Sequence, residues 1–165
     1  MRAVLFDLDE TLFDRSSCML ATAITMSREL GIDEQLFVDT FLQSDRENED
    51  KIKFANQILK RFPKIEISAQ DFVYFRDKTG IGCDELFPNV INTLKKIKKM
   101  NYKLGLVSNA SRKNYQLSKV ERLGLNAFMD TVVISDNKMK KPDRNIFDTA
   151  LSELSVSPSH TFFCR

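Results

Sequence analysis

Two aspartates near the start of the chain have a spacing that could place their carboxylates in one site. The segment Asp7-Leu8-Asp9 directly follows the apolar run Ala3 to Phe6. On an extended segment, side chains two residues apart point the same way. Two carboxylates that close repel each other unless a cation or a shared proton relieves them, and Mg²⁺ is well satisfied by carboxylate and phosphate oxygens. A magnesium-assisted phosphate site is one interpretation, and a simple turn cap is the other.

Two further polar segments follow apolar runs later in the chain. Ser108-Asn109-Ala110-Ser111 follows Leu104 to Val107 and offers hydroxyl, amide and helix N-terminal donors for a phosphate. The alternative is that Ser111 only caps the next helix. Lys141 lies before Pro142 after a third run, and a lysine there could offset carboxylate repulsion and hold a phosphoryl oxygen. Taken alone, such a lysine is more typical of a protein surface.

The elements that must position these residues are four short apolar runs. They are rich in Val, Ile, Leu and Phe and do not alternate with polar residues, which is typical of strands buried on both faces of a parallel sheet. Ligands of such sheets bind beyond the carboxyl ends of the strands. The sequence therefore predicts an α/β fold with a doubly wound parallel sheet. The runs are Ala3 to Phe6, Leu104 to Val107, Thr131 to Ile134 and Thr161 to Phe163.

Three helices are expected between these strands. Pro88 can occupy the first position of one, a second is expected from Ser111 to Leu123, and a third from about Pro142 to Leu154. Gly124 suits the left-handed position at the end of the second helix. Asp143 lies favourably near the positive end of the third.

The segment 14–86 contains no convincing buried strand, and its apolar residues recur at helical spacing. We expect an all-helical insertion there, between core segments 1–13 and 87–165. Asp33 and Ser68 are candidate helix caps, and residues 44–50 are expected to be a loop or a fraying helix end. The expected helices are 17–30, a second after Asp33, 51–62, and a fourth from Ser68 to about Thr79.

Composition bounds the class of protein. Of 165 residues, 42% are hydrophobic and 29% charged, and 25 basic residues against 23 acidic ones leave a net charge of +2. That balance favours an ordinary globular domain and gives no reason to expect a nucleic-acid or membrane partner. Three widely spaced cysteines without metal-site spacing indicate reduced thiols. The N-terminal apolar run is far too short for a signal peptide, so a cytoplasmic location is expected.

The three motifs occur in a fixed order, each after a predicted strand. The segments DLDET, VSNAS and KKPD, the last followed by Ile146-Phe147, together resemble the first three motifs of the haloacid dehalogenase-like hydrolases. The resemblance spans nearly the whole chain, and DLDET is its most specific part. It implies a phosphatase with a helical cap that closes over the site and selects a small phosphorylated metabolite.

The resemblance also implies a role for each motif residue. Asp7 would be the nucleophile that forms an aspartyl-phosphate, and Asp9 would protonate the leaving group and then activate water. Lys141 would steady Asp7 and the phosphate charge. Mg²⁺ would be bound at Asp7 and Asp9, including the Asp9 backbone carbonyl. The substrate-binding residues would be Thr11, Ser108 and Asn109.

The sequence departs from the family pattern after the last apolar run. The family's fourth motif supplies acidic metal ligands there, whereas Thr161-Phe162-Phe163 is followed by Cys164-Arg165. The expectation is an incomplete Mg²⁺ site and a core shortened at this end. Three alternatives stay open: a working phosphatase, a weak or inactive relative that binds phosphate or a partner, and a protein whose cap is mainly an interaction module. Nothing in the sequence positively supports the last.

Overall fold

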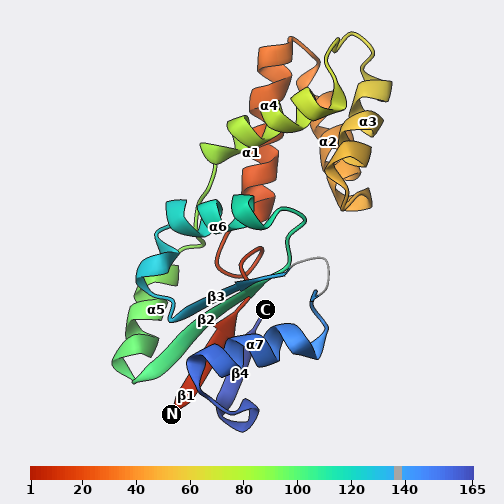
Figure 1. Cartoon of the computed structure of the whole chain (residues 1–165). Helices are drawn as coiled ribbons and strands as arrows, with labels where there is room; N and C mark the ends of the chain where they lie inside the picture. Colours follow the sequence, from red (N-terminus) through yellow and green to blue (C-terminus); the bar gives the residue numbers. More distant parts are fainter. Residues whose placement is uncertain (136–138) are drawn as a thin grey trace. The chain divides into compact units, whose positions relative to one another are not determined.

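The structure is a computed structural model that describes residues 1–135 and 139–165. Its chain folds as two compact units (Figure 1). The first combines Met1–Asp14 with Glu85–Arg165, and the second is Arg15–Asp84. Each is described by itself below.

A parallel sheet of four strands forms the centre of the first unit. The strands are β1 (Arg2–Phe6), β2 (Tyr102–Ser108), β3 (Thr131–Ile134) and β4 (Thr161–Cys164). Their spatial order is β3-β2-β1-β4, and every pairing is parallel. Phe6 at the end of β1 is in register with Leu106 and Cys164. The predicted α/β fold with a parallel sheet is confirmed, and the four predicted runs are its strands.

Helices cover this sheet. They are α5 (Val90–Lys99), α6 (Lys113–Arg122) and α7 (Arg144–Leu154), with short 3₁₀ turns at Leu125–Ala127 and Pro158–His160. The α7 helix packs Ile146 and Leu154 onto Leu5 and Val107, which point to one face of the sheet. Alternation along β2 sends Leu106 to the opposite face, where it is fully buried. Apolar side chains on both faces explain why the strands carry no polar alternation.

Gly105 in the middle of β2 allows α7 to lie close to the sheet. A Cβ atom at this position would come within 2.5 Å of Leu5 Cδ2 and 3.3 Å of Leu154 Cδ1. Contacts below about 3 Å between carbon atoms are strongly repulsive, because carbon pairs prefer separations of about 3.5–4.0 Å. The glycine therefore serves packing between the sheet and α7.

Three predicted helix starts in this unit are wrong by about two residues. The α7 helix begins at Arg144 rather than Pro142, with Asp143 as its N-cap. The α5 helix begins at Val90 rather than Pro88, because Asn89 takes a left-handed conformation with φ of +68°. The α6 helix begins at Lys113, after an extended Arg112 whose side chain makes no cap, so Ser111 is not its N-cap. A hydrogen bond from the Ala110 amide to Ser135 Oγ (2.9 Å) ties the preceding loop to the residue after β3 instead. Gly124, with φ of +67°, has the predicted left-handed conformation.

The second unit consists of four helices, α1 (Arg15–Leu30), α2 (Glu34–Glu47), α3 (Lys51–Arg61) and α4 (Ala69–Ile81). Asp33 and Ser68 cap α2 and α4 through the Leu36 and Asp71 amides, as predicted. The α2 helix continues to Glu47, so much of the polar segment expected to be a loop or a fraying end is helical. A chain of ring contacts fills the interior between α2, α3 and α4: Phe37, Phe41, Phe54, Phe62 and Phe72.

A buried carboxylate links the helices of this unit. The Asp45 side chain on α2 is only 4% exposed and lies 2.5 Å from Arg15, 3.4 Å from Lys51 and 3.6 Å from Arg76. Burial by itself raises the pKa of the Asp45 carboxyl, but the three cations outweigh it and hold the pKa below its ordinary value. In either unit, within the residues described, no helix is both long enough and apolar enough to span a bilayer.

Candidate active site

The motif residues of the first unit follow the carboxyl ends of adjacent strands. Asp7 comes directly after β1, Ser108 ends β2, and Ser135 follows β3. The strands are parallel, so these ends lie along one edge of the sheet. That edge is where open α/β sheets bind their ligands.

Asp7 is held through one of its two carboxylate oxygens. Its Oδ1 lies 2.6 Å from Lys141 Nζ and accepts a hydrogen bond of 2.7 Å from the Leu8 amide. The side chains of Asp7 and Lys141 are 15% and 13% exposed, so this is a largely buried, charge-assisted contact. No hydrogen bond or ion pair engages Oδ2 among the described residues. That oxygen is therefore available to a substrate.

Asn109 positions the backbone of Lys141. Its side-chain Oδ1 accepts from the Lys141 amide (2.8 Å), and its Nδ2 donates to the Lys141 carbonyl (3.1 Å). Both polar groups of the amide are thus engaged by a segment 32 residues away. The predicted substrate-binding residue Asn109 is placed here as a support for Lys141.

Asp9 is held by two residues of α6 that lie outside the three sequence motifs. Lys119 Nζ lies 3.2 Å from Asp9 Oδ1. Gln116 Nε2 donates to Asp9 Oδ2 (3.2 Å) and to Ser108 Oγ (3.1 Å). Gln116 and Lys119 are 4% and 7% exposed, unusual burial for such polar side chains. The available sequence signal was their spacing of three residues on the helix that follows VSNAS.

Ser108 contacts both Gln116 and the residue that follows β3. It is 1% exposed, and its backbone carbonyl accepts from the Ser135 amide (2.8 Å), which extends the pairing of β2 with β3. The structure thus connects Asp9 to Ser108 through Gln116, and Asp7 to Asn109 through Lys141. Five of the six predicted site residues fall into these two groups.

Thr11, the sixth predicted residue, joins neither group. Its Oγ1 is buried and has no hydrogen-bond partner among the described residues. Its amide donates to the Leu8 carbonyl (3.3 Å), which also accepts from Leu12 and Phe13 (both 3.0 Å). This tight turn places Glu10 in the left-handed region, with φ of +59°.

The donor set can be tested against Mg²⁺. Asp7 offers a hard carboxylate oxygen and Asp9 a backbone carbonyl oxygen, since both carboxylate oxygens of Asp9 accept from Lys119 or Gln116. Mg²⁺ is usually bound by one or two carboxylates, with phosphate and water completing its shell. Across residues 1–135 and 139–165, no three acidic, histidine or cysteine side chains gather into a metal-binding group. The residues fit an ion shared with a phosphate better than a cage made by protein alone.

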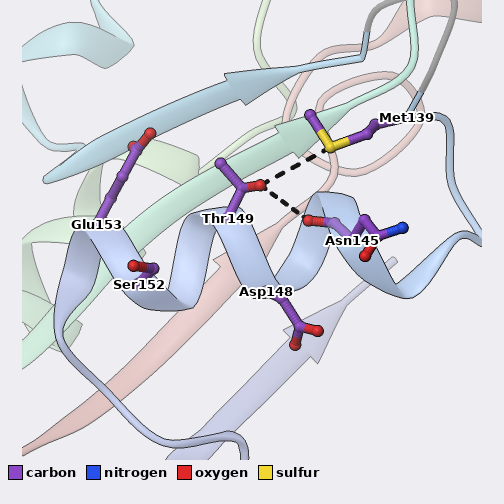
Figure 2. A pocket seen from close by; sticks show the side chains of 6 residues that line it. All are labelled: Met139, Asn145, Asp148, Thr149, Ser152 and Glu153. Carbon is purple, nitrogen blue, oxygen red and sulfur yellow. Dashed lines mark hydrogen bonds between the residues drawn. The ribbon is translucent and has the colours of Figure 1, made fainter.

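A separate hollow of about 460 Å³ lies along α7 (Figure 2). Thr149 donates to the Asn145 carbonyl (2.8 Å) and contacts the sulfur of Met139 (3.9 Å) within it. None of the predicted site residues lines this hollow. Its lining residues are Met139, Asn145, Asp148, Thr149, Ser152 and Glu153.

Known proteins resemble this chain over nearly its full length. The family model described as haloacid dehalogenase-like hydrolase matches residues 4–164. The glyceraldehyde 3-phosphate phosphatase of Methanopyrus kandleri is 29% identical, over 99% of this chain and 74% of its own. The pyrophosphatase PpaX of Bacillus velezensis is 30% identical, over 95% of this chain and 70% of its own.

A solved structure also matches nearly the whole chain. The crystal structure of a HAD phosphatase from Thermococcus onnurineus has a TM-score of 0.60 and 26% identity, and the match covers 99% of this chain and 76% of that one. The family match spans both units and all three motifs, from the strand before Asp7 to the end of β4. The chain therefore belongs to the haloacid dehalogenase-like hydrolases.

Proposed function

We propose that this protein is a phosphatase that acts on small phosphate monoesters through an aspartyl-phosphate intermediate on Asp7. The contact that carries the proposal is Lys141 Nζ at 2.6 Å from Asp7 Oδ1, with Oδ2 left without a protein partner among the described residues. A carboxylate nucleophile needs one oxygen available to attack and a cation to offset the charge that gathers around it. This pair meets both needs.

In the first step, Asp7 Oδ2 attacks phosphorus and the bond from phosphorus to the ester oxygen breaks. Asp9, carrying a proton, gives that proton to the departing oxygen, so the product leaves as a neutral alcohol. Lys141 and the Ser108 hydroxyl bind oxygens of the phosphoryl group during transfer. The charge of the transferring group is then shared between fixed donors rather than reorganising water.

In the second step, Asp9 is a carboxylate and accepts a proton from water. The water oxygen attacks phosphorus, the bond to Asp7 Oδ2 breaks, and inorganic phosphate forms. In this step both oxygens of Asp9 can accept, one from Lys119 (3.2 Å) and one from Gln116 (3.2 Å). Asp7 then returns to its starting state.

Asp7 and Asp9 would also hold Mg²⁺. When bound, the ion supplies positive charge that offsets the charge of the phosphate oxygens. The helical unit Arg15–Asp84 would act as the cap that excludes water and selects the substrate. Small phosphorylated metabolites are the proposed substrate class, in line with the names of the relatives.

The first experiment measures hydrolysis of an aryl phosphate by the wild-type chain and by Asp7→Asn, each with and without Mg²⁺. We expect magnesium-dependent turnover that the variant lacks, because an amide is a poor nucleophile. Glyceraldehyde 3-phosphate and pyrophosphate follow as candidate substrates. Equal turnover by the variant would exclude Asp7 as nucleophile, and a folded wild type without turnover on any of them would refute the phosphatase.

A further inference from the structure

The proposed mechanism needs Asp9 in one orientation, yet Asp9 lies in a tight turn outside the regular strands. Its side chain is 28% exposed, so its own burial does not confine it. What confines it is a pair of contacts from α6, one to each carboxylate oxygen. A side chain held at both oxygens loses the freedom to rotate, and correct orientation is a large part of catalytic rate.

Lys119 itself is held firmly. Its side chain is buried, and its Nζ lies 4.4 Å from the centre of the Phe13 ring as well as 3.2 Å from Asp9 Oδ1. A cation over an aromatic face is attracted by the ring, and Phe13 is itself only 1% exposed. The lysine is thus a fixed charge rather than a flexible surface side chain.

Gln116 determines how Ser108 can use its hydroxyl. In the second step Asp9 is ionised and can only accept, so in that state the Gln116 atom facing it is the NH₂ group. The same group donates to Ser108 Oγ at 3.1 Å, which makes Ser108 an acceptor in that bond. Its own hydrogen is then left to donate elsewhere; its other partner, the Asn109 carbonyl at 3.5 Å, is distant.

We propose that Lys119 and Gln116 are positioning residues: Lys119 orients the Asp9 carboxylate, and Gln116 orients both Asp9 and the Ser108 hydroxyl toward the phosphoryl group. This inference rests on the proposed function. The inference predicts that replacing Lys119 and replacing Gln116 have different effects on turnover and phosphate binding. Loss of Lys119 slows turnover without weakening phosphate binding, whereas loss of Gln116 affects both.

The test uses kcat with an aryl phosphate, inhibition by inorganic phosphate, and melting temperature. Lys119→Met keeps the buried stem and removes the charge. We expect kcat to fall at least about tenfold, because a misplaced Asp9 loses part of the roughly 100- to 10,000-fold that general acid–base catalysis contributes. The phosphate inhibition constant should stay within about twofold, and Lys119→Arg, which keeps a positive charge beside Asp9, should lose less rate than Lys119→Met. Gln116→Met should lower kcat and raise the phosphate inhibition constant. Lys113→Met is the matched control, because Lys113 is an exposed lysine on the same helix.

A double-mutant cycle separates positioning from general damage. If Lys119 acts through Asp9, Lys119→Met should cost little further rate in an Asp9→Asn background. An undiminished kcat in Lys119→Met, or an equal loss in both backgrounds, would overturn the inference.

The melting temperatures of the same four proteins form a second cycle that needs no activity. We expect the melting temperature of the double variant to fall by less than the sum of the two single decreases, since each single change leaves a charge without its partner. Additive decreases in melting temperature would mean that Lys119 and Asp9 do not interact in solution, and this result would overturn the inference. A wild type without Asp7-dependent turnover refutes the proposed function and, with it, the positioning role, while a non-additive melting cycle would still establish the contact.

Discussion

Replacing Asn109 by Leu tests whether this side chain supports Lys141 rather than the substrate. Leucine has a similar shape and removes both hydrogen bonds to the Lys141 backbone, at 2.8 and 3.1 Å. Each bond contributes about 0.5–1.5 kcal/mol net, so the pair contributes roughly 1–3 kcal/mol. Lys141 should then hold Asp7 less firmly, although neither catalytic side chain has changed.

The magnitude follows from that range. If the whole loss appears in the transition state, kcat should fall roughly 5- to 150-fold, because about 1.4 kcal/mol corresponds to a factor of ten. If the same loss appears in the folded state, the melting temperature should fall by about 2–12 °C for a chain of this size. Both quantities are measured, with kcat taken well below the melting transition.

Two companion variants sharpen the result. Asn109→Asp keeps the acceptor for the Lys141 amide but places a carboxylate against the Lys141 carbonyl, so it should also lose activity. Asn114→Leu is the control, because Asn114 is exposed on α6. A fully active, folded Asn109→Leu protein would refute the reasoning, and so would a variant whose only defect is a higher KM.

Three further predictions concern Asp9, the sheet and the helical unit. Asp9→Asn should lose more kcat/KM on an alkyl phosphate than on an aryl phosphate, because only the poorer leaving group needs the proton in the first step; equal losses in kcat/KM would argue against an acid role. Gly105→Ala should destabilise the protein by about 1–3 kcal/mol in urea unfolding, because the new methyl group would lie 2.5 Å from Leu5 Cδ2, and an unchanged midpoint would contradict this packing. The folded-state pKa of Asp45 lies below its ordinary value of 3.8, so its ion pairs contribute stability that is present above about pH 4 and is lost as the pH falls through that lower pKa. Between pH 6 and pH 2 the melting temperature should therefore fall more steeply for wild type than for Asp45→Asn. The variant should also melt lower at neutral pH, because three cations lose the carboxylate that they share.

Local signals explain how much of the fold could be predicted. The strands are continuous apolar runs because both faces of the sheet are covered, and this pattern is visible without any structure. Asp33 and Ser68 are short polar side chains beside helix amides, so their capping is decided within three residues. The starts of α5 and α6 were missed because they depend on a left-handed Asn89 and on a loop bond to Ser135, which lies 25 residues from Ala110.

The candidate site was likewise predictable in part from local sequence signals. A motif such as DLDET reveals which side chains carry chemistry and where on the sheet they begin, because strand direction fixes the edge. It cannot reveal that Asn109 faces the backbone of Lys141, or that α6 packs so that a buried lysine contacts Asp9.

The sequence by itself thus determined the fold class, the order of the motifs and the carboxylates available for catalysis, since these depend on apolar runs and on spacing along a few residues. Only the tertiary structure decided which oxygen of Asp7 is held, which residues hold Asp9 and what supports Lys141. Those contacts join residues 32 to 134 positions apart. Their geometry is decided by how helices pack on the sheet, and no local pattern records that packing.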